Sequence, residues 1–171
     1  KLLSDKTRLV CFPHVSNIVG SLNDVELITQ KVHAAGAWVC VDGVAYAPHR
    51  RMDVKKWDVD FYLFSFYKIY GPHIACLYGK RGSMMAARNQ NHYFFGEESV
   101  PQKLNPGGMM HEAVASLQGV ADYLDGVYRH HADSNAEPDF QGRLDHVSDL
   151  FADHEEQISQ PVVDFLTRRN D

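Results

Sequence analysis

Polar side chains of chemically useful kinds stand at or just beyond the ends of three short apolar runs. Asp42 follows the run AWVCV, and Asn17 comes soon after RLVCFP. Ser65 and Lys68 lie at and beyond the end of DFYLFSF. Runs of this length are typical of strands buried on both faces of a sheet. Because ligands of open α/β sheets bind outside the carboxyl ends of the strands, we expect a carboxylate, an amine, a hydroxyl and an amide at one edge.

Lys68 is the candidate nucleophile of this set. Its position just past a strongly apolar strand predicts an amine partly withdrawn from water, which favours the neutral, nucleophilic form. The position also fits a solvated lysine at the start of a loop.

Asp42 directly follows an expected buried strand and so needs a cation or several donors as partners. A protonated pyridine nitrogen is one such cation, and holding it protonated makes pyridoxal phosphate (PLP) an electron sink. A turn aspartate before Gly43 is the alternative. Ser65 and the Gly-Pro-His turn after Lys68 could donate to a phosphate. Asn17 could donate to a cofactor oxygen, or could be a turn residue.

The elements that would position these residues can be inferred from the hydrophobic pattern. We expect strands at 8–13, 37–41, 60–66 and 74–78, and helices at 24–35, 111–130 and 144–168, with a potential break at Pro161. The helix between the first two strands predicts a parallel pair. Only seven residues, YKIYGPH, separate the last two strands. Because a parallel crossover needs about a dozen residues or more, the fourth strand should be antiparallel.

The composition narrows the classes of function. The 171 residues carry a net charge of −5, which gives no basic footprint for nucleic acid or for a membrane surface. No apolar run approaches the roughly 20 residues of a membrane helix. Each cysteine lies inside an apolar run, which predicts small buried thiols and a reducing cytoplasm (Cys11, Cys40, Cys76). The ten histidines form no metal-ligand motif, so we expect no metal site.

Two stretches of the sequence resemble the class V aminotransferase family, the group that includes the cysteine desulfurases. They are FPHVSNIVGSLNDVELITQKVHAAGAWVCVDGVAYAPHR and DFYLFSFYKIYGPHIACLYGKR. They are similar to the family's H-x-S-N-x-x-G, V-D-G-x-x-x-x-P-H and S-x-x-K-x-x-G-P segments, in order. Asp42 follows Asn17 by 25 residues and precedes Lys68 by 26, as the family's spacing requires.

The resemblance implies PLP as cofactor, with Lys68 as the Schiff-base lysine and Asp42 as partner of the pyridine nitrogen. It places Asn17 beside the cofactor ring and Ser65 at the phosphate. It implies fold type I: an α/β large domain with a mostly parallel sheet, one antiparallel strand and helices on both faces. It also implies a homodimer in which a Gly-Thr segment reaches the partner's phosphate. Here that segment is Gly107-Gly108, and Gly108 offers only its backbone N–H.

The chain departs from the cysteine desulfurases at two further positions. They carry Gln three residues after the aspartate and His just before the lysine, whereas this chain has Ala45 and Tyr67. Tyr67 joins Lys68 and Asp42 as a candidate catalytic residue, because a phenol can relay a proton. The implied activity is that of a cysteine desulfurase-like transferase or lyase acting on an amino acid.

The resemblance further implies that the chain is a fragment. Residues 1–125 would be the second half of the PLP-binding large domain, and residues 126–171 a linker and helix leading into a truncated small domain. Two other readings stay open. One is a chain that kept the fold and lost catalysis, to which Ala45, Tyr67 and Gly108 point. The other is a Rossmann-like nucleotide-binding domain, which would require a G-x-G-x-x-G segment that the sequence lacks.

Overall fold

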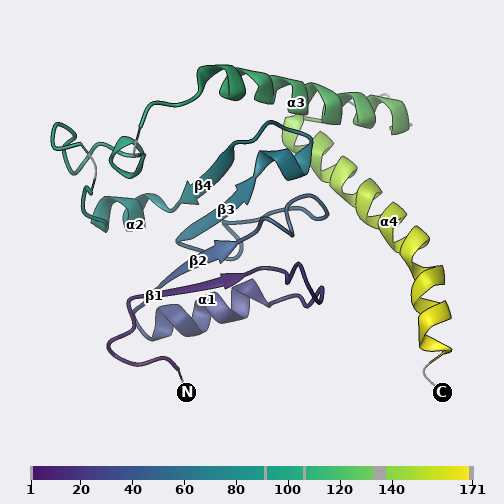
Figure 1. The fold of residues 1–171 in the computed structure, drawn as a ribbon, viewed down its shortest axis with the longest axis horizontal. Helices are drawn as coiled ribbons and strands as arrows, with labels where there is room; N and C mark the ends of the chain where they lie inside the picture. The colour runs from purple at the N-terminus through teal and green to yellow at the C-terminus, as the bar shows by residue number, and fades with distance from the viewer. Residues whose placement is uncertain (1, 91, 106, 133–137, 170–171) are drawn as a thin grey trace.

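A computed structural model describes residues 2–90, 92–105, 107–132 and 138–169, and shows a four-stranded sheet followed by two long helices (Figure 1). The strands are β1 (Leu9–Pro13), β2 (Trp38–Asp42), β3 (Phe61–Ser65) and β4 (Ala75–Gly79). The α-helices are α1 (Val25–Ala34), α2 (Arg81–Ala86), α3 (His111–His131) and α4 (Phe140–Thr167), with 3₁₀ turns η1 (Phe66–Ile69) and η2 (Gln102–Leu104).

The sheet has the strand order β1-β2-β3-β4, and its directions confirm the prediction from loop length. β1 pairs with β2 and β2 with β3 in parallel, while β4 runs antiparallel to β3. The register sets Pro13 opposite Asp42 and Asp42 opposite Leu63. The ends of the three parallel strands therefore share one edge of the sheet.

One face of the sheet holds the core. Asp24 caps α1 by accepting a hydrogen bond from the Leu27 N–H (2.9 Å). The buried side of α1 packs against β2, where Val39 and Val41 are fully buried. Because side chains alternate along a strand, the neighbouring residues of β2 point to the opposite face.

That opposite face is open in the described part of the chain, which corrects two expectations. β1 was expected to be buried on both faces, but Leu9 is 48% exposed. On β4, Leu77 is 53% exposed. Cys11 is exposed, and Cys40 and Cys76 are only partly buried, so they are not the buried thiols that the apolar runs predicted. The resemblance implies helices on both faces of the sheet. Among the described helices, α1 is the one that packs extensively on the sheet.

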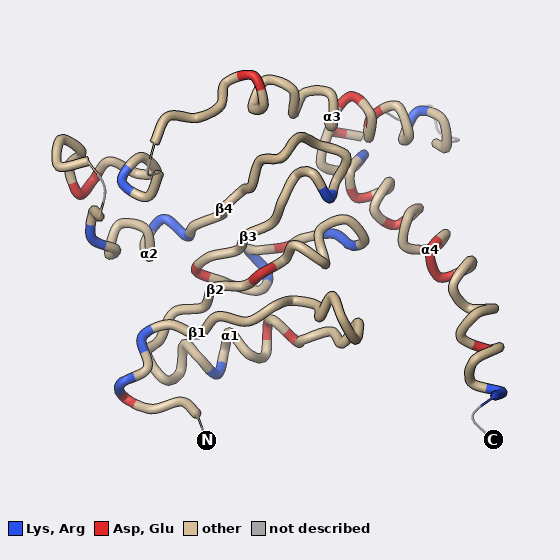
Figure 2. Tube along the Cα trace, in the orientation of Figure 1, with Lys and Arg blue, Asp and Glu red and all other residues tan. Residues whose placement is uncertain are grey.

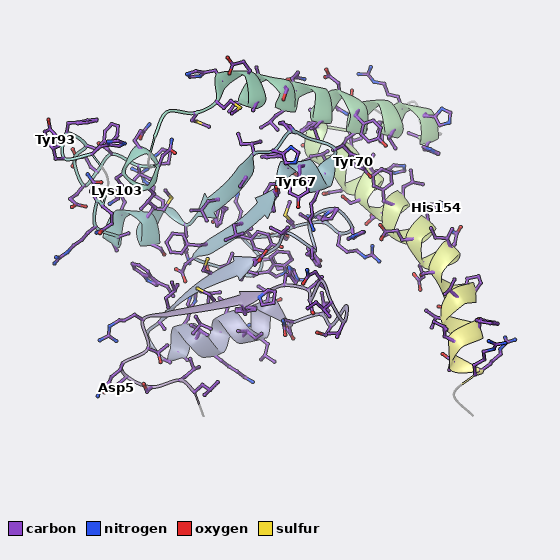
Figure 3. All side chains as sticks on the ribbon, in the orientation of Figure 1. Asp5, Tyr67, Tyr70, Tyr93, Lys103 and His154 are labelled. Carbon is purple, nitrogen blue, oxygen red and sulfur yellow. The ribbon has the colours of Figure 1, made fainter. Side chains whose placement is uncertain are left out.

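The region after β4 holds elements that the sequence analysis missed. The polar stretch from 80 to 108 contains α2 and η2, organised around Lys103. This lysine has no exposed surface, and its ammonium donates to the carbonyls of Met85, Ala87 and Glu97 (3.2, 2.7 and 2.6 Å). Two of these carbonyls lie at the end of α2, where a cation is favourable. Lys103 lies far from Tyr67 and Tyr70 (Figure 3).

The carboxyl-terminal part of the chain is helical. α3 and α4 pack against each other, and α4 continues through Pro161, where a break was anticipated. The helix surface around Pro161 is exposed, so water can hydrate the carbonyl that lacks a partner there. The linker expected within residues 126–171 falls partly outside the described residues, and α4 begins at Phe140. No helix among the described residues is both long and apolar enough to cross a membrane.

At the amino end of β3, Asp60 is the centre of a buried hydrogen-bond network. Asp60 is buried, and its carboxylate accepts hydrogen bonds from Ser83 Oγ (2.5 Å) and the Val39 N–H (2.9 Å). It also contacts His33 Nε2 at 2.8 Å. Burial alone would raise the pKa of Asp60, but these hydrogen bonds hold it below its ordinary value.

Candidate active site

The predicted site residues lie beyond the carboxyl ends of the three parallel strands, the ends that point towards α4 in Figure 1. Asp42 is the last residue of β2 and Ser65 the last of β3. Lys68 follows within η1, and Asn17 lies in an exposed turn after β1. The sheet register therefore brings Asp42 and the β3 end to the same edge, with Asn17 on the neighbouring loop.

The Asp42 carboxylate is exposed and accepts one hydrogen bond from the described residues. Its Oδ1 accepts from the Val44 N–H at 2.9 Å, the geometry of a turn aspartate, so this alternative reading describes its local contact correctly. In the part of the chain that the structure describes, no Lys, Arg or His reaches it within ion-pair distance. The second oxygen thus remains available to a cation.

Lys68 is exposed rather than partly desolvated, which corrects the reason given for its reactivity. Lys68 lies in the 3₁₀ turn η1, which has no buried residue. No hydrogen bond or ion pair holds its amine among the described residues, and Nζ lies 6.0 Å from the centroid of the Tyr67 ring. The Ser65 hydroxyl likewise has no hydrogen-bond partner there.

Tyr67 stacks on His73, which the sequence analysis considered only as part of the Gly-Pro-His turn. Its ring and the His73 ring are nearly parallel, at 11°, with centroids 5.1 Å apart. The β3–β4 register ends with Ser65 opposite Ala75, and the Phe66 N–H continues it by donating to the Ile74 carbonyl (2.9 Å). One step further lies Tyr67 opposite His73. Because the hairpin was expected, counting its register from the sequence would have found this pair.

Gly107 and Gly108 lie away from this edge in the same chain. Both are exposed, and they line a hollow with Phe94, Phe95 and Met109 on the α2–α3 connection. A Cβ added to Gly108 would meet no atom within 4 Å. The predicted role of Gly108 at a partner's phosphate therefore remains a prediction.

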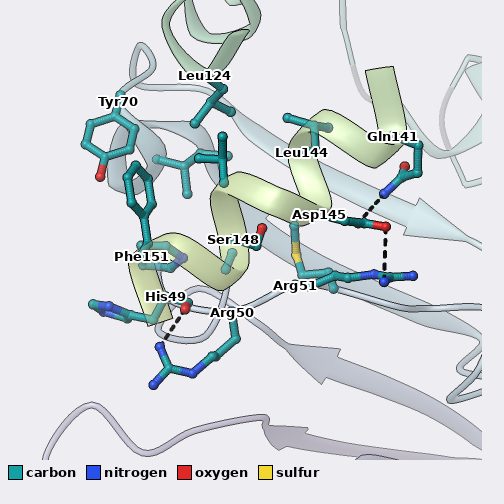
Figure 4. A pocket seen from close by; sticks show the side chains of 15 residues that line it. His49, Arg50, Arg51, Tyr70, Leu124, Gln141, Leu144, Asp145, Ser148 and Phe151 are labelled. Atoms are coloured by element: carbon teal, nitrogen blue, oxygen red, sulfur yellow. Dashed lines mark hydrogen bonds and ion pairs between the residues drawn. The ribbon is translucent and has the colours of Figure 1, made fainter. Parts of the chain in front are cut away.

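A pocket of about 300 Å³ adjoins the site between the loop after β2, η1 and the two long helices (Figure 4). Its floor is apolar, with Tyr70, Leu124, Leu144 and Phe151 among the lining residues. Tyr70 has left-handed backbone torsion (φ 69°) and packs on Tyr123 of α3 at 4.9 Å between centroids. The pocket thus joins η1, which carries Lys68, to α3 and α4.

Arg50 and Arg51 are exposed and form ion pairs with α4 beside this pocket. Arg50 Nη1 and His49 Nδ1 each lie 2.7 Å from a Glu155 oxygen, and Arg51 lies 3.1 Å from Asp145. Burial would raise the pKa of Glu155, but its bonds to His49 and Arg50 lower it. Figure 2 shows the same pattern, with basic positions on the loop after β2 near acidic positions of α4.

Comparison with known proteins decides the family. The model of the aminotransferase class-V family matches residues 1–149. The chain belongs to this family. Its members are PLP-dependent, and the cysteine desulfurases are among its relatives.

Individual relatives agree with this assignment. The chain is 35% identical over 169 residues to an aminotransferase-like protein of Gibberella zeae, covering 98% of this chain and 38% of the relative. It is 44% identical over 125 residues to a cysteine desulfurase-like protein of Aspergillus flavus, covering 72% of this chain and 28% of that protein. The solved structure of a cysteine desulfurase from Escherichia coli matches with a TM-score of 0.62 at 31% identity, over 72% of this chain and 34% of the other. The chain thus spans well under half the length of these relatives, and the structural match confirms the fold type I architecture.

The side chains at the strand ends fit PLP. Asp42 offers a carboxylate without a cation, Ser65 a hydroxyl without a partner and Lys68 an amine without a partner among the described residues. These are the groups that a pyridinium nitrogen, a phosphate and an aldehyde require. In the same described residues no cluster of three or more His, Cys, Asp or Glu side chains could hold a metal ion.

Proposed function

We propose that the protein to which this chain belongs is a PLP-dependent enzyme that acts on an amino acid through a Schiff base at Lys68. The observation that carries the proposal is that the Lys68 amine, just past β3, and the Asp42 carboxylate, at the end of β2, lie at the same sheet edge and have no ion-pair partner among the described residues. Bound PLP supplies an electron sink that stabilises negative charge at the substrate's α-carbon. Asp42 would keep the sink effective by holding the pyridine nitrogen protonated.

The other site residues have supporting roles in this proposal. Asn17 would donate to an oxygen of the cofactor, and Ser65 would donate its hydroxyl to the phosphate. Tyr67 would move a proton beside Lys68 or hold the ring next to it. The Tyr67–His73 stack supports this role, because it fixes the plane of the phenol beside the amine.

For the reaction itself we propose cysteine desulfurase-like chemistry with an altered proton path. Relatives named cysteine desulfurase or cysteine desulfurase-like support this class. Ala45 and Tyr67 stand where the desulfurases carry Gln and His, so a hydrogen bond to the cofactor oxygen is missing and a phenol replaces an imidazole. An amino-acid substrate other than cysteine is consistent with both changes.

We further propose the assembly and setting of the whole protein. Residues 1–125 would complete the second half of a PLP-binding large domain, and residues 126–171 would lead into a small domain. The protein would be a cytoplasmic homodimer in which the Gly108 N–H of one subunit serves the partner's phosphate. Glycines before a helix expose backbone N–H groups, and Gly107 and Gly108 precede α3.

The experiment uses the full-length protein with bound PLP. Borohydride reduction followed by peptide mapping should place the pyridoxyl group on Lys68. Lys80 is the matched control, because its amine is ion-paired to Asp58 (2.5 Å) at the other end of the sheet. Lys68→Ala should abolish labelling and turnover, while Lys80→Ala keeps both. A pyridoxyl group on any other lysine would refute the assignment.

A further inference from the structure

A buried histidine that the proposed chemistry does not use lies directly behind Asp42. His14 is only 4% exposed, although it follows the exposed end of β1. Its backbone N–H donates to the Asp42 carbonyl at 2.8 Å, which extends the β1–β2 pairing by one bond. The histidine is thus bonded to the main chain of the residue whose carboxylate faces the site.

The His14 side chain is bonded to a second strand. Its Nδ1 lies 2.9 Å from the Tyr62 hydroxyl on β3, and both residues are buried. Burial lowers the pKa of His14 to about 4 and raises the pKa of Tyr62 well above its ordinary value. At neutral pH the contact is therefore a hydrogen bond between a neutral imidazole and a neutral phenol.

The ring of Tyr62 closes the space beneath Gly43, the residue after Asp42. A Cβ at Gly43 would overlap Tyr62 ring atoms, so the fit requires glycine there. The Gly43 N–H donates to the Leu63 carbonyl at 2.8 Å. Gly43 is thereby held between a ring below it and a strand beside it.

The far end of the same turn rests on His14. The Tyr46 N–H donates to the Gly43 carbonyl (3.0 Å), and the Tyr46 ring stacks on the imidazole with centroids 3.6 Å apart at 10°. Trp57 closes the cluster edge-on to His14, at 4.7 Å between centroids. One imidazole therefore contacts both supports of the turn, Tyr62 under its start and Tyr46 at its end.

We infer that His14, acting through its hydrogen bond to Tyr62, is a positioning residue for the Asp42 carboxylate. The inference rests on the proposed function, because it assumes that Asp42 meets a pyridinium nitrogen. Among the described residues the Asp42 carboxylate accepts one hydrogen bond, from the Val44 N–H, so its direction depends on where the backbone of the turn is held. The His14–Tyr62 hydrogen bond holds the backbone of the turn without contacting the Asp42 carboxylate, which stays available to the cofactor.

The test uses the full-length holoprotein with PLP labelled with ¹⁵N at the pyridine nitrogen. Tyr62→Phe removes only the hydroxyl, and His14→Phe keeps a ring to stack on Tyr46 while removing Nδ1. Both variants should move the ¹⁵N resonance in solid-state NMR towards the unprotonated position. Both should lower kcat about tenfold with little change in KM, since small displacements of a positioned group cost this much or more.

Tyr78→Phe is the matched control. Tyr78 lies opposite Tyr62 in the β3–β4 register and packs against the same core, but has no hydrogen bond to His14. This variant should leave the ¹⁵N resonance unchanged. A normal ¹⁵N resonance in Tyr62→Phe and His14→Phe, with only a lower Tm, would overturn the inference and leave a purely structural pair. An unprotonated nitrogen in the wild-type protein would instead overturn the role of Asp42, and the inference with it.

Discussion

The aspartates at the two ends of the β-sheet differ in burial and in hydrogen bonding. At the amino end of β3, Asp60 is buried and bound by Ser83, His33 and the Val39 N–H. At the carboxyl end of β2, the Asp42 carboxylate is exposed and, among the described residues, accepts one hydrogen bond, from a backbone N–H. Buried charges need full compensation, whereas a carboxylate left incomplete at a strand end can take a ligand. The contrast separates a carboxylate whose hydrogen bonds are satisfied within the fold from one that is free to bind a ligand.

The lysines at the two ends follow the same division. Lys80 is ion-paired with Asp58 at the amino end, while Lys68 has no ion pair or hydrogen bond among the described residues at the carboxyl end. A charged side chain that is already ion-paired within the fold cannot easily exchange its partner. A charged side chain without such a partner can bind a cofactor with little rearrangement.

The largest expected effect comes from removing the charge of the site carboxylate. Asp42→Asn in the full-length protein keeps the side chain's shape and should reduce kcat on the order of 100- to 1,000-fold, as loss of one charge-stabilising group does. Its unfolding free energy should stay close to that of the wild type, because Asp42 is exposed. Steady-state kinetics and urea unfolding measure the two quantities. Near-normal turnover would remove Asp42 from the chemistry.

Removing the buried carboxylate at the amino end of β3 should lower stability and not turnover. Asp60→Ala leaves His33, Ser83 and a buried N–H without their common acceptor and should lower the unfolding free energy by about 3 kcal/mol. Turnover per folded molecule should be retained. Urea unfolding together with activity at low temperature would show both. A stable but inactive variant would abolish the distinction between the two ends.

A smaller effect should appear in the pH dependence of stability. The pKa of folded His14 is about 4, against an ordinary value of 6.5, so unfolded chains bind a proton that folded chains exclude. Stability should therefore fall by up to about 3 kcal/mol as pH drops from 6.5 to 4, and this contribution should change no further below pH 4. His14→Phe should lack this part of the pH profile. Parallel profiles for the two proteins would contradict the buried neutral histidine.

The smallest effect should come from the phenol beside the site lysine. Tyr67→Phe should lower kcat about tenfold while PLP affinity changes less, since solvent and His73 can supply part of the proton transfer. His73→Phe keeps a stacked ring and separates packing from proton movement. Equal losses of kcat and PLP affinity in Tyr67→Phe would mark the tyrosine as a structural residue.

The sequence was sufficient to predict the order and direction of the strands. Loop length alone decided that β4 is antiparallel, and the ends of the apolar runs located Asp42, Ser65 and Lys68 at one edge. The hairpin register could also have found His73. These features depend on residues close together in the chain, where spacing constrains geometry.

Features that depend on distant segments could not be predicted in this way. The His14–Tyr62 bond joins residues 48 apart, and Glu155 reaches back over 100 residues to His49 and Arg50. The exposure of Lys68 was also misjudged, because an apolar neighbourhood in sequence did not make one in space. The prediction of buried cysteines was wrong for the same reason, since strand composition does not say which face of a sheet is covered.

The enclosure of Lys103 gives the protein a built-in reporter of local opening. Trypsin must draw a lysine side chain into its own pocket, and the ammonium of Lys103 is enclosed by three carbonyls. Cleavage after Lys103 therefore requires the α2–η2 segment to open first, whereas Arg88 in the same segment is exposed. The ratio of cutting at these two sites would follow the population of the open form, and so the free energy of opening this segment.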